Sequence, residues 1–171
     1  ANFLEYRETK VHFLNTLAPD HIVLINIDDL GARSILPELQ VPYVSYGLSH
    51  HAQIRAVNVD LFPQTSSFLL TIDHPLSTHR GTISPLKLPL LTKVPGRHNI
   101  ANALAAAAAA LVYSVDTRVI QQGLATFNGV SRRLEWHRLA GFTVLDDTAL
   151  NPASFDAVFE SIAVFPYNRL R

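Results

Sequence analysis

Two asparagines that follow a glycine turn have the side chains and the spacing to bind a ligand. Asn99 and Asn102 stand three positions apart, after Pro95-Gly96 and at the start of an alanine-rich run. On a helix this spacing places both amides on one face, where an amide can pair with the N6 and N7 edge of an adenine. Asparagine is also a common first residue of a helix, so a cap formed by Asn99 is the alternative interpretation.

The alanine-rich run predicts the helix that would carry these amides. Residues 99–113 contain eight Ala and two Leu, which are among the best helix formers. Asp116 is well placed as the N-cap of a second helix over 117–127, and Asn128-Gly129 ends it. The sequence therefore predicts a helical pair followed by a boundary near Gly129.

The remaining pattern predicts an α/β fold, in which a sheet with flanking helices includes a small antiparallel patch. Apolar or amphipathic residues every three or four positions predict a helix over 3–17, and HIVLINI is typical of a buried strand. A short helix over 32–39 and a strand over 42–46 follow. Further strands are expected over 52–59, 66–73, 86–91, 134–137 and 142–146, with a last helix over 152–164.

The composition excludes several classes of protein. The chain of 171 residues has 14 basic and 14 acidic side chains, a balance that argues against nucleic acid or a membrane surface as partner. Its longest apolar stretch, around 104–113, is shorter than the roughly 20 residues of a membrane span. There is no cysteine, so disulfides and thiolate sites are excluded and the cytoplasm is the expected location. The eight histidines lack the spacing of a metal motif.

Three segments match one protein family in order. PGRHNIANALAAA fits G-x-H-N-x-x-N-x-x-A-A, and FLEYRETKVHFLNTLAPDHIVLINIDD fits an F-x-x-Y-x-x-x-K helix before a strand ending in N-x-D-D. GLATFNGVSRRLEWHRLAGFTVLDDTALNP fits G-L-x-x-F-x-G-V-x-x-R-x-E followed by a D-D-x-A-x-N-P turn. By these segments, which bracket residues 2–160, the chain resembles the Mur ligase superfamily, the ATP-dependent amide ligases of cell-wall precursor synthesis.

The resemblance implies that Lys10 is the family's carbamylated lysine. Its CO₂ adduct would turn a cation into a carboxylate that binds Mg²⁺, which prefers oxygen ligands. Lys10 is therefore the expected catalytic and metal-binding residue. Tyr6, one helical turn earlier, matches the motif and is expected to pack. The alternative, which the residues alone favour, is an ordinary solvated lysine on an amphipathic helix.

The resemblance also implies a site for ATP. Asn99 and Asn102 would bind the adenine, Arg133 would reach the phosphates from the domain junction, and Asp147 would accept hydrogen bonds from the ribose hydroxyls. A guanidinium suits phosphate, and a carboxylate suits a vicinal diol.

Both of the last two assignments have alternatives. Arg133 could instead form a rim salt bridge with Glu135, and Arg132 could exchange roles with it. Asp147 could be a turn or cap residue before the last helix, and Asp146 is a close competitor.

The sequence departs from the family pattern in two ways. Thr148 and Leu150 stand where an aromatic residue and a histidine are common. No G-x-x-x-x-G-K-[ST] phosphate loop is present, so we expect a fragment that is inactive by itself. Residues 1–129 would be the later part of the central ATP-binding domain, and 130–171 the incomplete start of a Rossmann-like C-terminal domain.

The function implied for the parent enzyme is ATP-dependent ligation through an acyl phosphate. Its expected partners are ATP, Mg²⁺, an amino acid and a carboxylate-bearing precursor of the UDP-muramyl type. A folylpolyglutamate or cyanophycin-type ligase, or a non-catalytic scaffold with a Mur-ligase-like fold, is the alternative. The sequence leaves the amino acid, the acceptor and the oligomeric state open.

Overall fold

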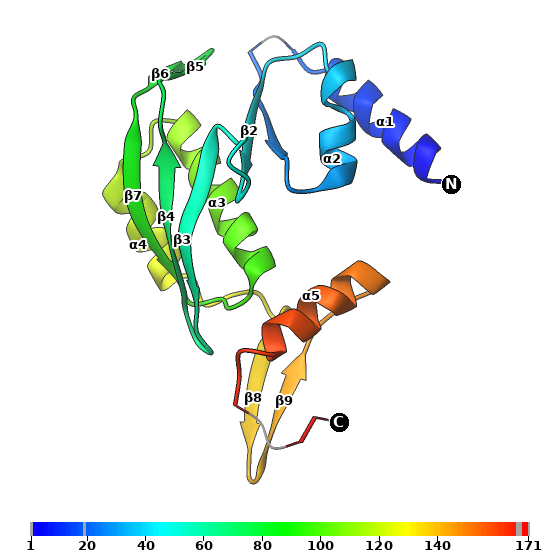
Figure 1. Ribbon diagram of the computed structural model, residues 1–171, viewed down its shortest axis with the longest axis vertical. Helices are drawn as coiled ribbons and strands as arrows, with labels where there is room; N and C mark the ends of the chain where they lie inside the picture. Colours follow the sequence, from blue (N-terminus) through cyan, green and yellow to red (C-terminus); the bar gives the residue numbers. More distant parts are fainter. Residues whose placement is uncertain (1, 19, 167–168, 171) are drawn as a thin grey trace.

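A five-stranded sheet in the order β1-β2-β3-β4-β7 lies at the centre of the computed structural model, which describes residues 2–18, 20–166 and 169–170 (Figure 1). β1, β2 and β3 pair in parallel, whereas β3, β4 and β7 pair antiparallel. This is the predicted α/β architecture, and the antiparallel strands continue the parallel ones in the same sheet. The strands are β1 Val23–Asn26, β2 Tyr43–Gly47, β3 Ile54–Leu61, β4 Ser66–Ile72 and β7 Leu86–Thr92.

The strand sequences suit their places in the sheet. In β1, Val23 and Ile25 are buried and the alternate residues, Leu24 and Asn26, are half-buried, as expected for a strand covered on both faces. β7 is the edge strand of the sheet and contains Pro89, which has no backbone N–H to donate. An edge strand tolerates proline because only one of its sides pairs with another strand. The carbonyl of Pro89 accepts a hydrogen bond of 2.9 Å from Nε2 of Gln121.

Two helices cover the sheet. Helix α3, Arg97–Val112, contacts β1, β2, β3 and β4, and α4, Thr117–Thr126, contacts β7. The small alanines of α3 let it approach the strands closely, and Ile100 and Leu104 are fully buried in the main core. The carboxylate of Asp116 accepts a hydrogen bond of 2.7 Å from Arg118 N, so the predicted cap of α4 is confirmed.

Helix α1, Phe3–Asn15, is attached differently, because none of its side chains is buried. Val11 and Leu14 are half-buried against a small core around β1 that is separate from the main core. The neighbouring elements are α2, Leu30–Ser34, and the 3₁₀ helix η1, Leu36–Glu38.

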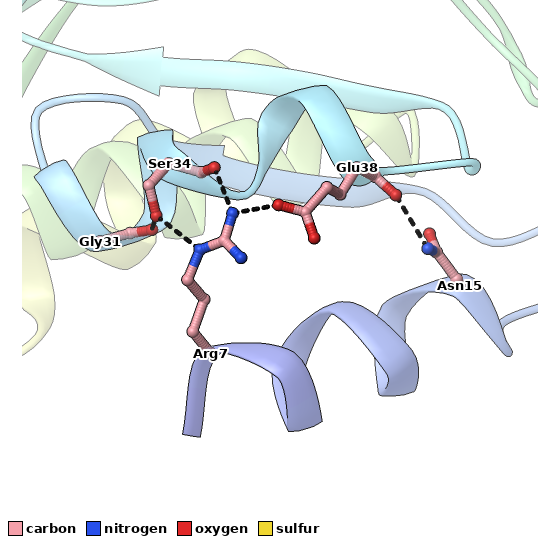
Figure 2. Close-up of polar contacts among 5 residues, drawn as sticks. All are labelled: Arg7, Asn15, Gly31, Ser34 and Glu38. Atoms are coloured by element: carbon pink, nitrogen blue, oxygen red, sulfur yellow. Dashed lines mark hydrogen bonds and ion pairs between the residues drawn. The ribbon is translucent and has the colours of Figure 1, made fainter. Parts of the chain in front are cut away.

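Polar contacts complete the attachment of α1 (Figure 2). The guanidinium of Arg7 forms an ion pair with Glu38 and donates to the carbonyl of Ser34 at 2.8 Å. Nδ2 of Asn15 donates to the carbonyl of Glu38 at 2.9 Å. These contacts fix the helix that carries Lys10.

The last part of the described chain forms a hairpin and a helix beyond the end of the central sheet (Figure 1). The hairpin strands are β8, Glu135–Leu139, and β9, Phe142–Asp146, and the helix is α5, Pro152–Ile162. They agree with the elements predicted there, while a boundary near Gly129 stays a prediction. A second short hairpin, β5 Leu76–Thr78 with β6 Gly81–Ile83, was not predicted.

Among the described residues, no helix has both the length and the apolar character needed to cross a membrane.

Candidate functional site

The glycine turn before α3 places Asn99 within the first turn of the helix. Gly96 has φ +101°, a backbone region that favours glycine, and α3 begins at Arg97. Nδ2 of Asn99 donates to the carbonyl of Pro95 at 2.8 Å, so this side chain bonds back to the turn. The alternative of an N-cap formed by Asn99 is therefore wrong, because the N-cap position belongs to Gly96.

Asn102 lies beside Asn99, as the spacing predicts. Its Nδ2 donates to Oδ1 of Asn99 at 3.2 Å, and its side chain is exposed. Within the described part of the chain, Oδ1 of Asn102 accepts no hydrogen bond from a protein donor. The pair thus offers a polar edge with a free acceptor, as recognition of a base edge requires.

The second part of the candidate site is the turn that enters β8. Arg133 lies in this turn and lines a cavity of about 390 Å³. The cavity is also bordered by Lys93–Pro95, the segment before α3, and by Asn128–Ser131, the segment after α4. Arg133 and the segment before α3 are therefore neighbours in space although they are far apart in sequence, while Asn99, Asn102 and Asp147 do not line this cavity.

The structure distinguishes Arg133 from Arg132. Nε of Arg132 lies 3.7 Å from Oδ2 of Asp146, whereas Arg133 forms no ion pair with any described residue. The suggested salt bridge between Arg133 and Glu135 is wrong, because the carboxylate of Glu135 pairs with Nε2 of His137 at 3.8 Å and accepts hydrogen bonds from Ser131 Oγ and the backbone N–H of Arg132. Arg133 is thus the guanidinium available to a ligand.

Asp147 has one oxygen engaged with the protein. Its Oδ2 accepts a hydrogen bond of 2.9 Å from the backbone N–H of Leu134, whereas Oδ1 has no donor among the described residues. The alternative role as a helix cap is wrong, because Asn151 caps α5 through a bond of 2.9 Å from Ser154 N. The competing carboxylate, Asp146, is next to the guanidinium of Arg132.

His98 connects these two parts. It follows the glycine turn, and burial lowers the pKa of its imidazole below 6.5. The carboxylates of Asp147 and Glu160 oppose this shift by attracting the protonated ring, so both lie within electrostatic reach of it. Helix α5 also packs here, since a Cβ at position 96 would meet Ser161. The start of α3 and α5 therefore meet near His98, and Asp147 is near enough for its charge to act on the ring.

We expect the free energy of unfolding to fall as the pH drops below about 6.5, because the unfolded chain then binds a proton that folded His98 resists. This contribution is complete above the unfolded pKa and is lost progressively down to the lower folded pKa. Urea unfolding at several pH values should show a shallower decline for His98→Gln. The exposed His79→Gln is the control, and an unchanged decline in His98→Gln would contradict the assignment.

Lys10 is not brought to the rest of the predicted site. Its side chain is exposed, and Nζ lies 5.2 Å from the centre of the Tyr6 ring. In Figure 1, α1 lies away from the end of α3 that contacts α5. No hydrogen bond or ion pair within the described residues joins Lys10 to the asparagines, to Arg133 or to Asp147.

The spacing of the histidines did not predict one cluster of three residues whose types can bind a metal ion. Glu135, His137 and Asp146 on the β8–β9 hairpin have ligand atoms within 4.8 Å of one another. The alternation of residues along β8 and its pairing with β9 is the signal that could have found them. Glu135 is already hydrogen-bonded, and Arg132 places a positive charge beside Asp146, which disfavours a cation there.

Comparison with known proteins places this geometry in context. The family model described as "Mur ligase middle domain" matches residues 1–110. UDP-N-acetylmuramate--L-alanine ligase of Geobacter sulfurreducens is 34% identical over 154 residues, which cover 90% of this chain and 31% of that protein. The chain thus spans about a third of the length of the curated relatives it matches.

Solved structures agree on the fold. MurF of Acinetobacter baumannii superposes with a TM-score of 0.74 at 24% identity, covering 93% of this chain and 33% of that one. A folylpolyglutamate synthase of Mycobacterium tuberculosis, complexed with ADP, superposes with a TM-score of 0.67 at 20% identity, covering 95% and 35%.

The middle-domain match spans more than half of the sequence. The structure, with its five-stranded sheet and flanking helices, superposes on a solved ligase of this kind. The chain belongs to the Mur ligase family.

Proposed function

We propose that the junction between the start of α3 and the turn before β8 binds ATP. The observation that carries this proposal is that α3 presents two adjacent amides while the neighbouring turn leaves Arg133 without an ion pair among the described residues. One edge for a base and one cation for phosphates are the two groups that nucleotide recognition needs.

Each residue would have a separate role. Asn99 and Asn102 would bind the adenine, and Arg133 would contact the phosphates. Asp147 would use Oδ1 for the ribose hydroxyls while Oδ2 stays bonded to Leu134. The donors and acceptors present thus fit a nucleoside phosphate. We also propose residues 1–129 as the later part of the ATP-binding domain and 130–171 as the start of the next one.

The reaction we propose for the parent enzyme is amide formation. The γ-phosphoryl group of ATP passes to a carboxylate oxygen of the acceptor, and the amine of an amino acid then displaces phosphate from the acyl carbon. The products are an amide, ADP and inorganic phosphate. The named relative from Geobacter sulfurreducens joins L-alanine to UDP-N-acetylmuramate, which supports an amino acid and a UDP-muramyl acceptor for this chain. A folylpolyglutamate-type ligase is the second candidate, supported by likeness of fold alone.

Lys10 would contribute to the chemical step as a carbamate. An ammonium group cannot bind a cation, but the exposed Nζ of Lys10 is accessible to CO₂ and forms no ion pair with any described residue. The carbamate oxygens fit the preference of Mg²⁺, which keeps several waters and phosphate oxygens as further ligands. When bound, Mg²⁺ neutralises charge on the transferring phosphoryl group. The chain's own part is to orient one oxygen ligand from α1.

Replacing Arg133 by alanine should weaken ADP binding about tenfold, because a charge-assisted hydrogen bond to phosphate is worth roughly 1.5–3 kcal/mol. Isothermal titration of the full-length gene product with ADP measures this. Arg138→Ala removes an equal charge from the exposed part of the same hairpin and should leave binding unchanged. If Arg132→Ala weakens binding and Arg133→Ala does not, the two arginines have exchanged roles. Absence of ADP binding by the unaltered protein would contradict the proposed function.

A further inference from the structure

We propose that Glu135 is a positioning residue that acts through Arg133. Its carboxylate fixes the turn over 131–134 in the conformation that presents Arg133 to the nucleotide. This inference rests on the proposed function, because it takes Arg133 as the phosphate contact.

The turn has an unusual backbone. Arg132 has φ +59° and Leu134 has φ +50°, and neither is glycine. Left-handed backbone is disfavoured for residues with a Cβ, and most of all for a bulky one such as leucine. Such a conformation persists only where the surroundings determine it. Arg133 stands between these two residues, so its direction depends on whatever fixes them.

Glu135 supplies contacts that fix the first half of the turn. Its Oε2 accepts a hydrogen bond of 2.8 Å from the backbone N–H of Arg132 and one of 2.9 Å from Oγ of Ser131. These two bonds, helped by nearby His137, lower the pKa of Glu135, so the acceptor is a full carboxylate at neutral pH. Bonds to an ionised acceptor are stronger than neutral ones.

The other half of the turn is fixed from the segment after β9. Asp147 accepts from the N–H of Leu134, and the backbone N–H of Thr148 donates to the carbonyl of Arg132 at 3.1 Å. Oγ1 of Thr148 donates to the same carbonyl at 3.3 Å. Asp147 has a proposed ligand contact of its own, whereas the hydrogen bonds of Glu135 are with the turn and its one other polar contact among the described residues is His137, at 3.8 Å. Glu135 therefore isolates the positioning effect.

The test is a double-mutant cycle on ADP affinity in the full-length gene product. Glu135→Ala should raise the Kd for ADP about tenfold, and Glu135→Gln about threefold, since its amide oxygen still accepts a hydrogen bond. In an Arg133→Ala background, Glu135→Ala should add no further loss. In the activity assay, KM for ATP should rise more than kcat falls. Asp73→Asn is the control, since it removes a carboxylate paired with Arg55 on the sheet.

The outcomes separate this inference from the function on which it rests. The inference is supported if Glu135→Ala weakens ADP binding only when Arg133 is present. If Glu135→Ala lowers only the melting temperature, or weakens binding equally without Arg133, Glu135 is merely structural and the inference fails while the nucleotide site stands. If the unaltered protein does not bind ADP, both fail. Should Glu135→Ala not fold, Ser131→Ala removes one of the same contacts and should raise the Kd about twofold to threefold, again only when Arg133 is present.

Discussion

Lys10→Ala should lower the rate of ATP-dependent amide formation by roughly 10²–10³-fold while changing ADP affinity by less than about twofold. The loss is large because the proposed carbamate helps to stabilise charge on the transferring phosphoryl group, and one such group typically contributes that much. Affinity is spared because α1 lies away from the end of α3 that carries the two asparagines (Figure 1). Steady-state release of inorganic phosphate and ADP titration of the full-length gene product measure the two effects.

A second substitution separates a carbamate from a simple cation. Lys10→Arg keeps the positive charge but forms no stable carbamate, so it should be as inactive as Lys10→Ala. Lys87→Ala, on an exposed position of β7, should keep full activity. An active Lys10→Arg enzyme would contradict the carbamate, and loss of ADP binding in Lys10→Ala would mean that Lys10 is a nucleotide contact instead.

Gly96→Ala should destabilise the fold by roughly 2–4 kcal/mol, the sum of backbone strain and overpacking. The new Cβ would lie 2.3 Å from Oγ of Ser161 at a residue with φ +101°. Ser161 is buried and its Oγ is bonded to the carbonyl of Ala157, so it cannot simply rotate away without losing that bond. We therefore expect α5 to shift. Urea unfolding of the full-length gene product measures the change.

Gly123→Ala is the matched control. Gly123 lies within α4, and a Cβ there meets nothing within 4 Å. In an open helical position, alanine in place of glycine should stabilise the fold by about 0.5–1 kcal/mol. Opposite signs for the two substitutions would show that the local constraints at position 96, its positive φ together with packing against α5, cause the loss of stability. Equal effects would mean that position 96 is not constrained as described.

Local patterns were sufficient to predict the elements that carry the candidate site. The alanine-rich run marks α3 and Asp116 marks the start of α4, because helix propensity and capping act within a few residues. The buried run of β1 predicted its strand in the same way. The short β5–β6 hairpin was missed because its three-residue strands are too brief for an alternating pattern to stand out.

The connections between distant residues could not be read from the sequence. Asp147 bonds to the backbone of Leu134, and Glu135 bonds to the backbone of Arg132. A hydrogen bond to a backbone N–H does not depend on the residue type of its donor, so the sequence does not reveal it. The sequence likewise does not reveal the left-handed backbone conformation of Leu134. The resemblance named Arg133 and Asp147, but only the placement of Arg132 beside Asp146 shows which members of each pair remain available.

The attachment of α1 has a consequence for how activity could be lost. Of the apolar residues of this helix, only Val11 and Leu14 are half-buried against a core separate from that of the sheet, and Arg7 and Asn15 supply its polar contacts (Figure 2). Segments with few buried contacts open at a lower free energy than the whole fold. On warming, α1 would then detach before the rest of the fold unfolds, and Lys10 would be the first of the proposed site residues to be displaced. The nucleotide could remain bound after catalysis had stopped, so the temperature limit of the proposed parent enzyme would be set by one helix rather than by the sheet.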